Sequence, residues 1–209
     1  MSTTTSEFGR VLRASTTGFA VGCRVTQLAG PAFGALIKAQ PVAEREAIYG
    51  LIYDMHIDDD PLVRRLVLVE NPPTAVINDQ RRNRLLPIEM SILAIGYRQN
   101  GKLYHGLPPR PPLNLDPAYL CTDPDEIRDF TNRLGYLRLI LRTTGSPVPV
   151  DQLLVAHILS IYHLRDQDDT WALSAIQELI ELLRSNYDIL IPTLEALSDA
   201  LPNLDLPQD

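Results

Sequence analysis

Lysine is scarce in this chain, and several motifs that would name a chemistry are missing. Lys38 and Lys102 are the only lysines among 209 residues, and neither lies in a glycine-rich phosphate-binding loop. The sequence also lacks Gly-x-Ser-x-Gly, His-Glu-x-x-His and Cys-x-x-Cys, which excludes the common serine hydrolases, zincins and zinc ribbons. We therefore expect a protein that is not an enzyme, with no cofactor and no metal.

Long apolar runs and paired cysteines are absent as well. No window approaches eighteen uncharged apolar residues, and residues 1–7 form neither a basic nor an apolar leader. Cys23 and Cys121 are far apart in the sequence, so we expect two free thiols instead of a disulfide. These features predict a cytoplasmic protein with no membrane partner.

Charge divides the chain into two halves. Residues 1–115 hold 13 Lys and Arg against 10 Asp and Glu, whereas residues 116–209 hold 6 against 16. The halves therefore carry +3 and −10, which sum to the net charge of −7. Opposite halves of this kind attract each other or partners of opposite sign.

The first half has the pattern of short β-strands. Runs of β-branched and aromatic residues alternate with Gly, Pro, Asn and Asp, and Asn100-Gly101 is a strong hairpin signal. In the clearest run, Tyr49 to Ile57 alternate as one apolar face, and Gly50 permits a neighbour to approach closely. The predicted strands are 8–14, 18–26, 34–40, 46–57, 63–70 and 85–98. About six such strands predict a small barrel over residues 7–106.

The second half has the pattern of helices. Five prolines between Leu107 and Pro117 predict an extended strap within a linker, 107–123. An acidic helical domain over 124–202 follows, because Asp123-Pro124 is a helix start and apolar residues then recur at helical spacing. Gly135 either kinks or ends the first helix, and 137–141 fit a strand as well. The predicted fold class is α+β, a small β-barrel followed by a small helical bundle.

The glycines and β-branched pairs of the first half resemble those of a known barrel. The segments are Phe8-Gly9-Arg10-Val11, Gly18-Phe19, Gly34-Ala35-Leu36-Ile37-Lys38 and Ile48-Tyr49-Gly50-Leu51-Ile52-Tyr53, followed by the proline-rich exit. They resemble the HAS barrel of HerA-type DNA translocases and of the F-type ATP synthase α and β subunits. In that family the barrel arranges subunits and receives partners, and a RecA-like ATPase core follows it. The helical second half is too short for such a core, so the resemblance implies a barrel that stands alone.

Two acidic segments are candidate metal sites. In His56-Ile57-Asp58-Asp59-Asp60-Pro61, one imidazole and three carboxylates cluster, but contiguous aspartates cannot all face one ion. Asp166-Gln-Asp-Asp169 begins like a calcium loop, but Trp171 stands where that loop needs glycine. We interpret them as a solvated turn and a helix cap. An enzyme site around His56 and Asp58 is the weakest of the functional hypotheses.

One basic run remains as a binding candidate. Arg81, Arg82 and Arg84 are expected in a loop between two strands, with Tyr97 and Arg98 on a nearby hairpin. The favoured hypothesis is a soluble, non-catalytic adaptor or assembly module that docks another protein through the barrel and this arginine loop. The alternative is a nucleic-acid-associated accessory factor that uses the same arginines on phosphates. Association of several copies is left open.

Overall fold

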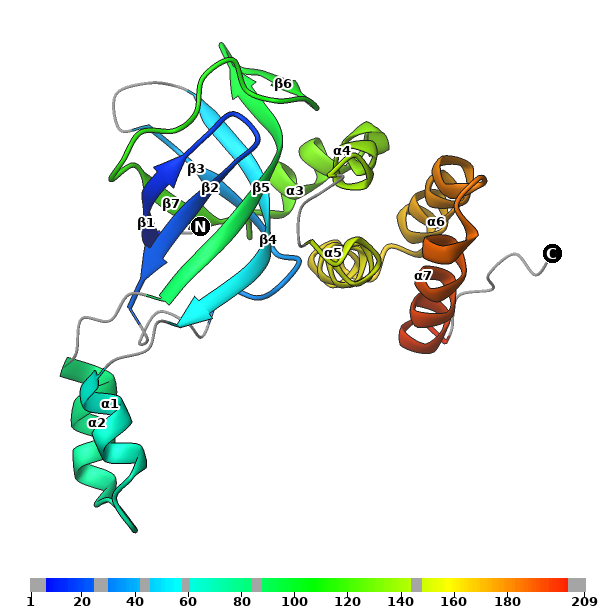
Figure 1. Cartoon of the computed structure of the whole chain (residues 1–209). Coiled ribbons are helices and arrows are strands. Elements are labelled where there is room, and N and C mark those ends of the chain that lie inside the picture. Colours follow the sequence, from blue (N-terminus) through cyan, green and yellow to red (C-terminus); the bar gives the residue numbers. More distant parts are fainter. Residues whose placement is uncertain are drawn as a thin grey trace.

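The structure is a computed structural model, and it describes residues 7–24, 30–41, 46–57, 61–83, 88–143 and 148–202. Within 61–83, side chains are described for residues 64–79. The fold is α+β: a closed antiparallel β-barrel comes first and a group of helices follows (Figure 1). The fold class predicted from the sequence is therefore confirmed.

Six strands close the barrel in the described part of the chain. Their hydrogen-bonded order is β2-β1-β7-β3-β4-β5, and β2 pairs with β5 to complete the ring. β6 continues from β5 as a short hairpin outside the ring. The bounds are β1 Glu7–Ala14, β2 Gly18–Cys23, β3 Leu36–Ala39, β4 Ala47–Ile57, β5 Ile88–Gln99, β6 Lys102–Tyr104 and β7 Pro117–Leu120.

Two glycine predictions are confirmed. Asn100 and Gly101 join β5 to β6 with φ of 51° and 77°, the positive values that a type I′ turn requires. A Cβ at Gly50 would lie 2.6 Å from the carbonyl oxygen of Leu93 on β5, so only glycine fits at this place in β4.

The predicted strand at 63–70 is wrong. The segment begins with helix α1 (Pro61–Val67), and a second helix, α2 (Thr74–Asn83), follows. Pro61 fixes the φ that a first helical residue needs, and Leu62, Val63, Leu66 and Val67 recur at helical spacing. The loop expected at 78–84 is also wrong, because residues 78–83 belong to α2.

The sixth strand of the ring comes from beyond the proline-rich strap. The strap follows β6 and is fastened to β1, where Arg10 donates to the carbonyl of Leu115 at 3.0 Å. Pro117 then opens β7, which pairs with β1 on one side and β3 on the other. The sequence pattern predicted that the barrel ends at residue 106. The strand that closes it, β7, lies beyond that residue.

The remaining helices are α3 (Pro124–Thr131), the 3₁₀ turn η2 (Leu134–Tyr136), α4 (Leu137–Leu141), α5 (Val150–Leu164), α6 (Asp169–Leu183) and α7 (Tyr187–Ala200). Asp123 caps α3 as predicted, accepting from the Asp125 N–H at 3.4 Å, and Asp168 caps α6 by accepting from Trp171 at 3.0 Å. Gly135 lies in η2, so the first helix ends before it, and 137–141 are helical.

Two apolar clusters share the barrel wall. One fills the barrel and draws on all six strands of the ring, with Phe8, Phe19, Ile37, Ile52, Met90 and Ala118 among its members. The other lies between the outer wall and the helices, where Tyr49, Leu51 and Ile95 meet residues of α3 to α7. Strand β4 is thus buried on both faces along its first half. Figure 1 shows α3, α4 and α5 on this side of the barrel.

Candidate docking site

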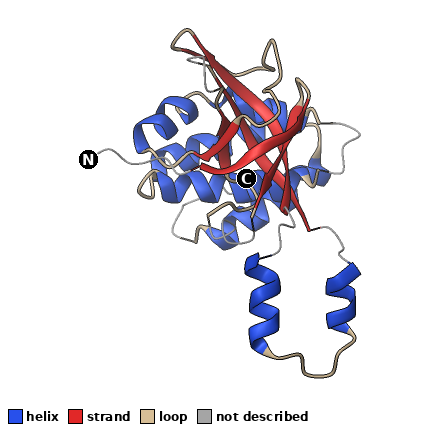
Figure 2. Ribbon diagram, turned by 90° about the vertical axis from the view of Figure 1, so that its left-hand side faces the viewer, coloured by secondary structure: helices blue, strands red, loops and turns tan. Residues whose placement is uncertain are grey.

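Among the described residues, a pair of helices that projects from the barrel carries several large exposed apolar side chains. We call residues 61–83, which contain α1, α2 and the turn between them, the arm (Figures 1 and 2). Four of its apolar side chains are large and exposed: Leu68 at 85 %, Val67 at 77 %, Val69 at 49 % and Val76 at 38 %. Among residues 64–79 no side chain is buried.

The arm is an excursion from a β-hairpin. The last residue of β4, Ile57, pairs directly with the first residue of β5, Ile88. Two paired ends of this kind can be joined by a turn of two residues, yet here they are joined by 58–87. The ring of six strands is complete without the arm.

The described side chains of the arm, 64–79, form no buried apolar face. Helices of seven and ten residues are marginal in water, because their nucleation is not recovered over so few hydrogen bonds. Helices in proteins are mostly held by burial of an apolar face, and the described arm residues have none buried. An exposed apolar patch on a monomer marks an interaction site. A bound partner would supply the missing cover.

Two of the three predicted arginines, Arg81 and Arg82, belong to this arm. Arg64 and Arg65 are exposed on α1. Arg81 and Arg82 lie in the last turn of α2, and their side chains are outside the described set. Arg84 lies outside the described residues. Arg81 and Arg82 therefore lie on a helix and not on a loop, and α1 adds two further arginines.

Arg98 and Tyr97 do not join those arginines. They lie near the end of β5 that leads to β6, whereas α2 leads into the opposite end of the same strand, and Figure 1 shows the arm and β6 at opposite ends of the barrel. Tyr97 stacks on Tyr104 with ring centroids 5.0 Å apart. Arg98 donates to Asp129 at 2.6 Å and to the hydroxyl of Tyr49 at 3.2 Å. Its partners make Arg98 a structural residue.

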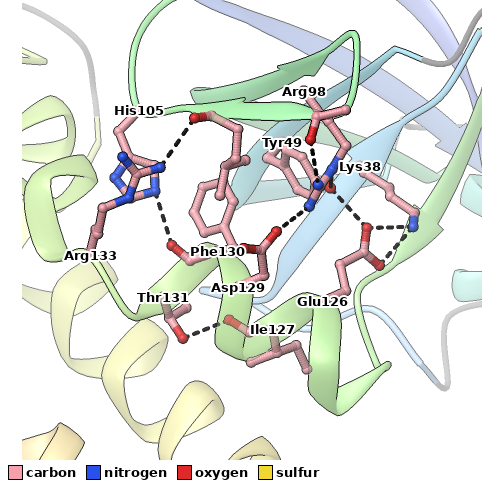
Figure 3. A network of polar contacts seen from close by, with 12 residues as sticks. Lys38, Tyr49, Arg98, His105, Glu126, Ile127, Asp129, Phe130, Thr131 and Arg133 are labelled. Carbon is pink, nitrogen blue, oxygen red and sulfur yellow. Dashed lines mark hydrogen bonds and ion pairs between the residues drawn. The ribbon is translucent and has the colours of Figure 1, made fainter.

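Arg98 is part of a polar contact between the barrel and α3 (Figure 3). We call this contact the seam; it joins Lys38, Tyr49 and Arg98 of the barrel to Glu126, Asp129 and Phe130 of α3. Lys38 donates to both carboxylate oxygens of Glu126 at 2.7 Å, and Tyr49 donates to the same carboxylate at 2.9 Å. Burial, together with the charge of Glu126, raises the pKa of Tyr49. The two cations and two carboxylates balance, which is the condition for burying charge.

Below the seam, aromatic rings connect α3 to α5. Phe130 contacts Tyr49, His105 and Tyr136 with centroid distances of 4.8, 5.0 and 5.2 Å. The ring nitrogens of His157 lie 3.0 Å from the Tyr136 hydroxyl and 3.1 Å from the Gly34 carbonyl oxygen. Burial lowers the pKa of His157 to about 4, so the ring is neutral at pH 7. This histidine is a core residue, as its place in the predicted helix indicated.

Neither acidic segment gathers a metal site in the described ranges. His56 is exposed at the end of β4, and Asp58, Asp59 and Asp60 lie outside the described residues. Asp168 is occupied as the α6 cap and as the partner of Arg165 at 2.9 Å. No group of three or more His, Cys, Asp or Glu among the described residues could hold an ion.

Two hollows flank the link between α4 and α5. The first, of about 560 Å³, is lined by Arg13, Arg142, five hydroxyl side chains and apolar residues, but by no described His, Cys or carboxylate. The second, of about 540 Å³, is lined mainly by apolar residues, with Asp54 at its edge. Arg13 is already held by the carboxylate of Glu89. Neither hollow brings together a nucleophile and a base.

No protein-family model matches the chain, and no curated protein matches it. Within the described ranges, no helix has both the length and the apolar character needed to cross a membrane. The arm, with its apolar side chains and its arginines, is therefore the candidate site. Sequence reasoning found the arginines and missed Val67, Leu68, Val69 and Val76, although Pro61 and the helical spacing after it were the available signal.

Proposed function

We propose that this protein is a non-catalytic assembly module of the cytoplasm that docks another protein through the arm. The exposure of Val67 and Leu68 at the turn of a projecting helical pair is the observation that carries the proposal. The arm combines exposed apolar side chains with the exposed Arg64 and Arg65, and protein interfaces favour an apolar centre and are enriched in arginine. The two cysteines are free and buried, which suits a reducing compartment.

The arrangement of the barrel supports the arm, and not the barrel wall, as the docking site. The outer wall of β3 to β5 is covered by the chain's own helices, so it is not open to a partner. The resemblance to the HAS barrel, which in its family receives partners, agrees with a barrel that serves as a rigid platform. We also propose that the chain belongs to the HAS-barrel family and that its barrel works without an ATPase core.

Affinity capture tests the proposal. The wild type is compared with the arm variant Val67→Ser/Leu68→Ser and with a matched control, Leu113→Ser/Leu115→Ser, whose leucines are 70 % and 67 % exposed on the strap. We expect proteins that are retained by the wild type and the control and lost from the arm variant. The same proteins retained by all three would exclude the arm as the docking site.

Nuclease treatment distinguishes docking of a protein from the alternative, binding to nucleic acid. Binding to nucleic acid would fail after nuclease and after Arg81→Gln/Arg82→Gln/Arg84→Gln, and it would weaken steeply with salt. Docking of a protein through apolar side chains would survive nuclease. Capture that disappears with nuclease would favour the nucleic-acid-associated factor.

A further inference from the structure

The arm and the last two helices carry opposite charge. The arm contains four arginines against Glu70 and Asp79. Helices α6 and α7 contain six carboxylates and no lysine or arginine. Charge of opposite sign on two faces favours their association and disfavours contact between two arms.

The outward face of α7 also matches the arm in its apolar content. Leu190, Thr193 and Leu197 are buried against the protein, which leaves Asp188, Ile191, Glu195 and Asp199 as an exposed stripe at helical spacing. Ile191 is 46 % exposed, and Tyr187 at the start of the helix is 65 % exposed. We call this the α7 face. Its carboxylates lie on the same face as these two apolar side chains.

The arm does not meet this face within one molecule. Figure 1 shows the arm projecting from one end of the barrel and α7 lying on the far side of α5, away from the barrel. A contact between the arm and the α7 face therefore requires a second molecule.

We propose that the arm docks on the α7 face of a second copy of this chain. The inference rests on the proposed function and names the partner of the same site. Two different surfaces meet, so the contact is head-to-tail, and each molecule keeps one free arm and one free α7 face. Repetition gives a ring if the rotation closes and an open filament if it does not.

Charge reversal with rescue tests the proposal. Arg64→Glu/Arg65→Glu makes the arm acidic, and Asp188→Arg/Glu195→Arg makes the α7 face basic. Each variant alone then opposes like charges, and we expect its self-association to weaken at least about tenfold relative to the wild type. In an equimolar mixture every arm again faces a surface of opposite sign, so assembly returns. Sedimentation velocity on the purified full chain at low and high salt measures both effects, because salt screens exposed charges.

A matched control separates local from overall charge. Lys102→Glu/Arg110→Glu changes the net charge by the same amount as the arm variant, at exposed positions outside the arm. We expect this control to assemble like the wild type. Recovery in the mixture shows that both variants are folded.

Three results would overturn the inference. They are a wild type that stays monomeric at about 100 µM, a basic α7 face that leaves assembly unchanged, and a mixture that fails to recover. None of them bears on the proposed function, which fails if the arm variant captures the same proteins as the wild type or if capture disappears with nuclease. An arm that captures a different protein while the chain stays monomeric would keep the function and reject the second copy as partner.

Discussion

The seam and the arm differ in how their side chains are covered: those of the seam are paired or buried, and those of the arm are exposed to water. In the seam, each charged group has its partner within 2.6 to 3.2 Å, and the aromatic rings beside it are buried. In the arm, apolar side chains stand in water on two short helices. The seam buries its side chains, whereas the described side chains of the arm stay exposed.

This difference separates the residues that hold the molecule together from those available for binding. Arg98 looked like a binding residue beside a hairpin, but its contacts are made within the chain. Val67 and Leu68 looked like strand residues, but they contact almost nothing. Exposure of an apolar surface lowers solubility, so its cost is offset only where something covers it. Each prediction below changes one side of the comparison.

The largest effect is expected from the aromatic residue at the centre of the seam. Phe130→Ala removes a fully buried ring that contacts three others, so the free energy of unfolding should fall by about 4 kcal/mol. Urea unfolding followed by circular dichroism measures it. Leu68→Ala, an apolar truncation in the arm, should change the same quantity by less than about 0.5 kcal/mol. Equal losses in the two variants would contradict the division into seam and arm.

Acid should lower the free energy of unfolding through His157, which lies in the buried contact between the barrel and the helices. The unfolded chain takes up a proton near the ordinary pKa of 6.5, whereas the folded protein does so near 4, so unfolding is favoured as the pH falls between these values. The loss amounts to about 3 kcal/mol when the pH reaches 4, and it is absent above pH 7. Unfolding free energies measured in this window give the slope.

His157→Gln serves as the control for the acid effect. Glutamine keeps a hydrogen-bonding side chain but does not titrate, so the slope between pH 6.5 and 4 should become shallower. A variant with the slope of the wild type would assign the acid sensitivity to other groups.

A smaller loss is expected from the ion pair of the seam. Glu126→Gln leaves the ammonium of Lys38, 13 % exposed, without its counter-charge, which should cost about 2 kcal/mol. The double variant Lys38→Met/Glu126→Leu removes both charges and should recover most of the loss. Thermal unfolding of the three proteins checks the order. A double variant less stable than Glu126→Gln would mean that the pair itself is strongly stabilising.

The smallest effect on folding is expected from removal of the arm. Since Ile57 pairs with Ile88, an Asn-Gly turn in place of 58–87 should preserve the barrel and change the free energy of unfolding by less than about 1 kcal/mol. The same deletion should abolish arm-dependent capture. Failure of the shortened chain to fold would show that the arm supports the barrel after all.

The sequence predicted the parts of the fold whose patterns are unambiguous. The alternation through Tyr49 and Leu51, the Asn100-Gly101 turn and the Asp123-Pro124 helix start each have a single local interpretation. The arm did not, because a short run such as Leu-Val-Arg-Arg-Leu-Val-Leu-Val fits a strand or a helix. The pairing partners of Arg98 were also out of reach, since Asp129 lies 31 residues away and is brought close only by the packing of α3.

The position of β7 has a consequence for how the chain is made. Before residue 120 has left the ribosome, β1 and β3 have no strand between them, and their backbone groups are open to any strand nearby. Nascent chains halted while β7 is still inside the ribosome would carry these open edges and tend to aggregate, whereas chains long enough to release β7 would not. Ribosome stalling at this stretch of prolines would therefore prolong the exposure of the open strand edges.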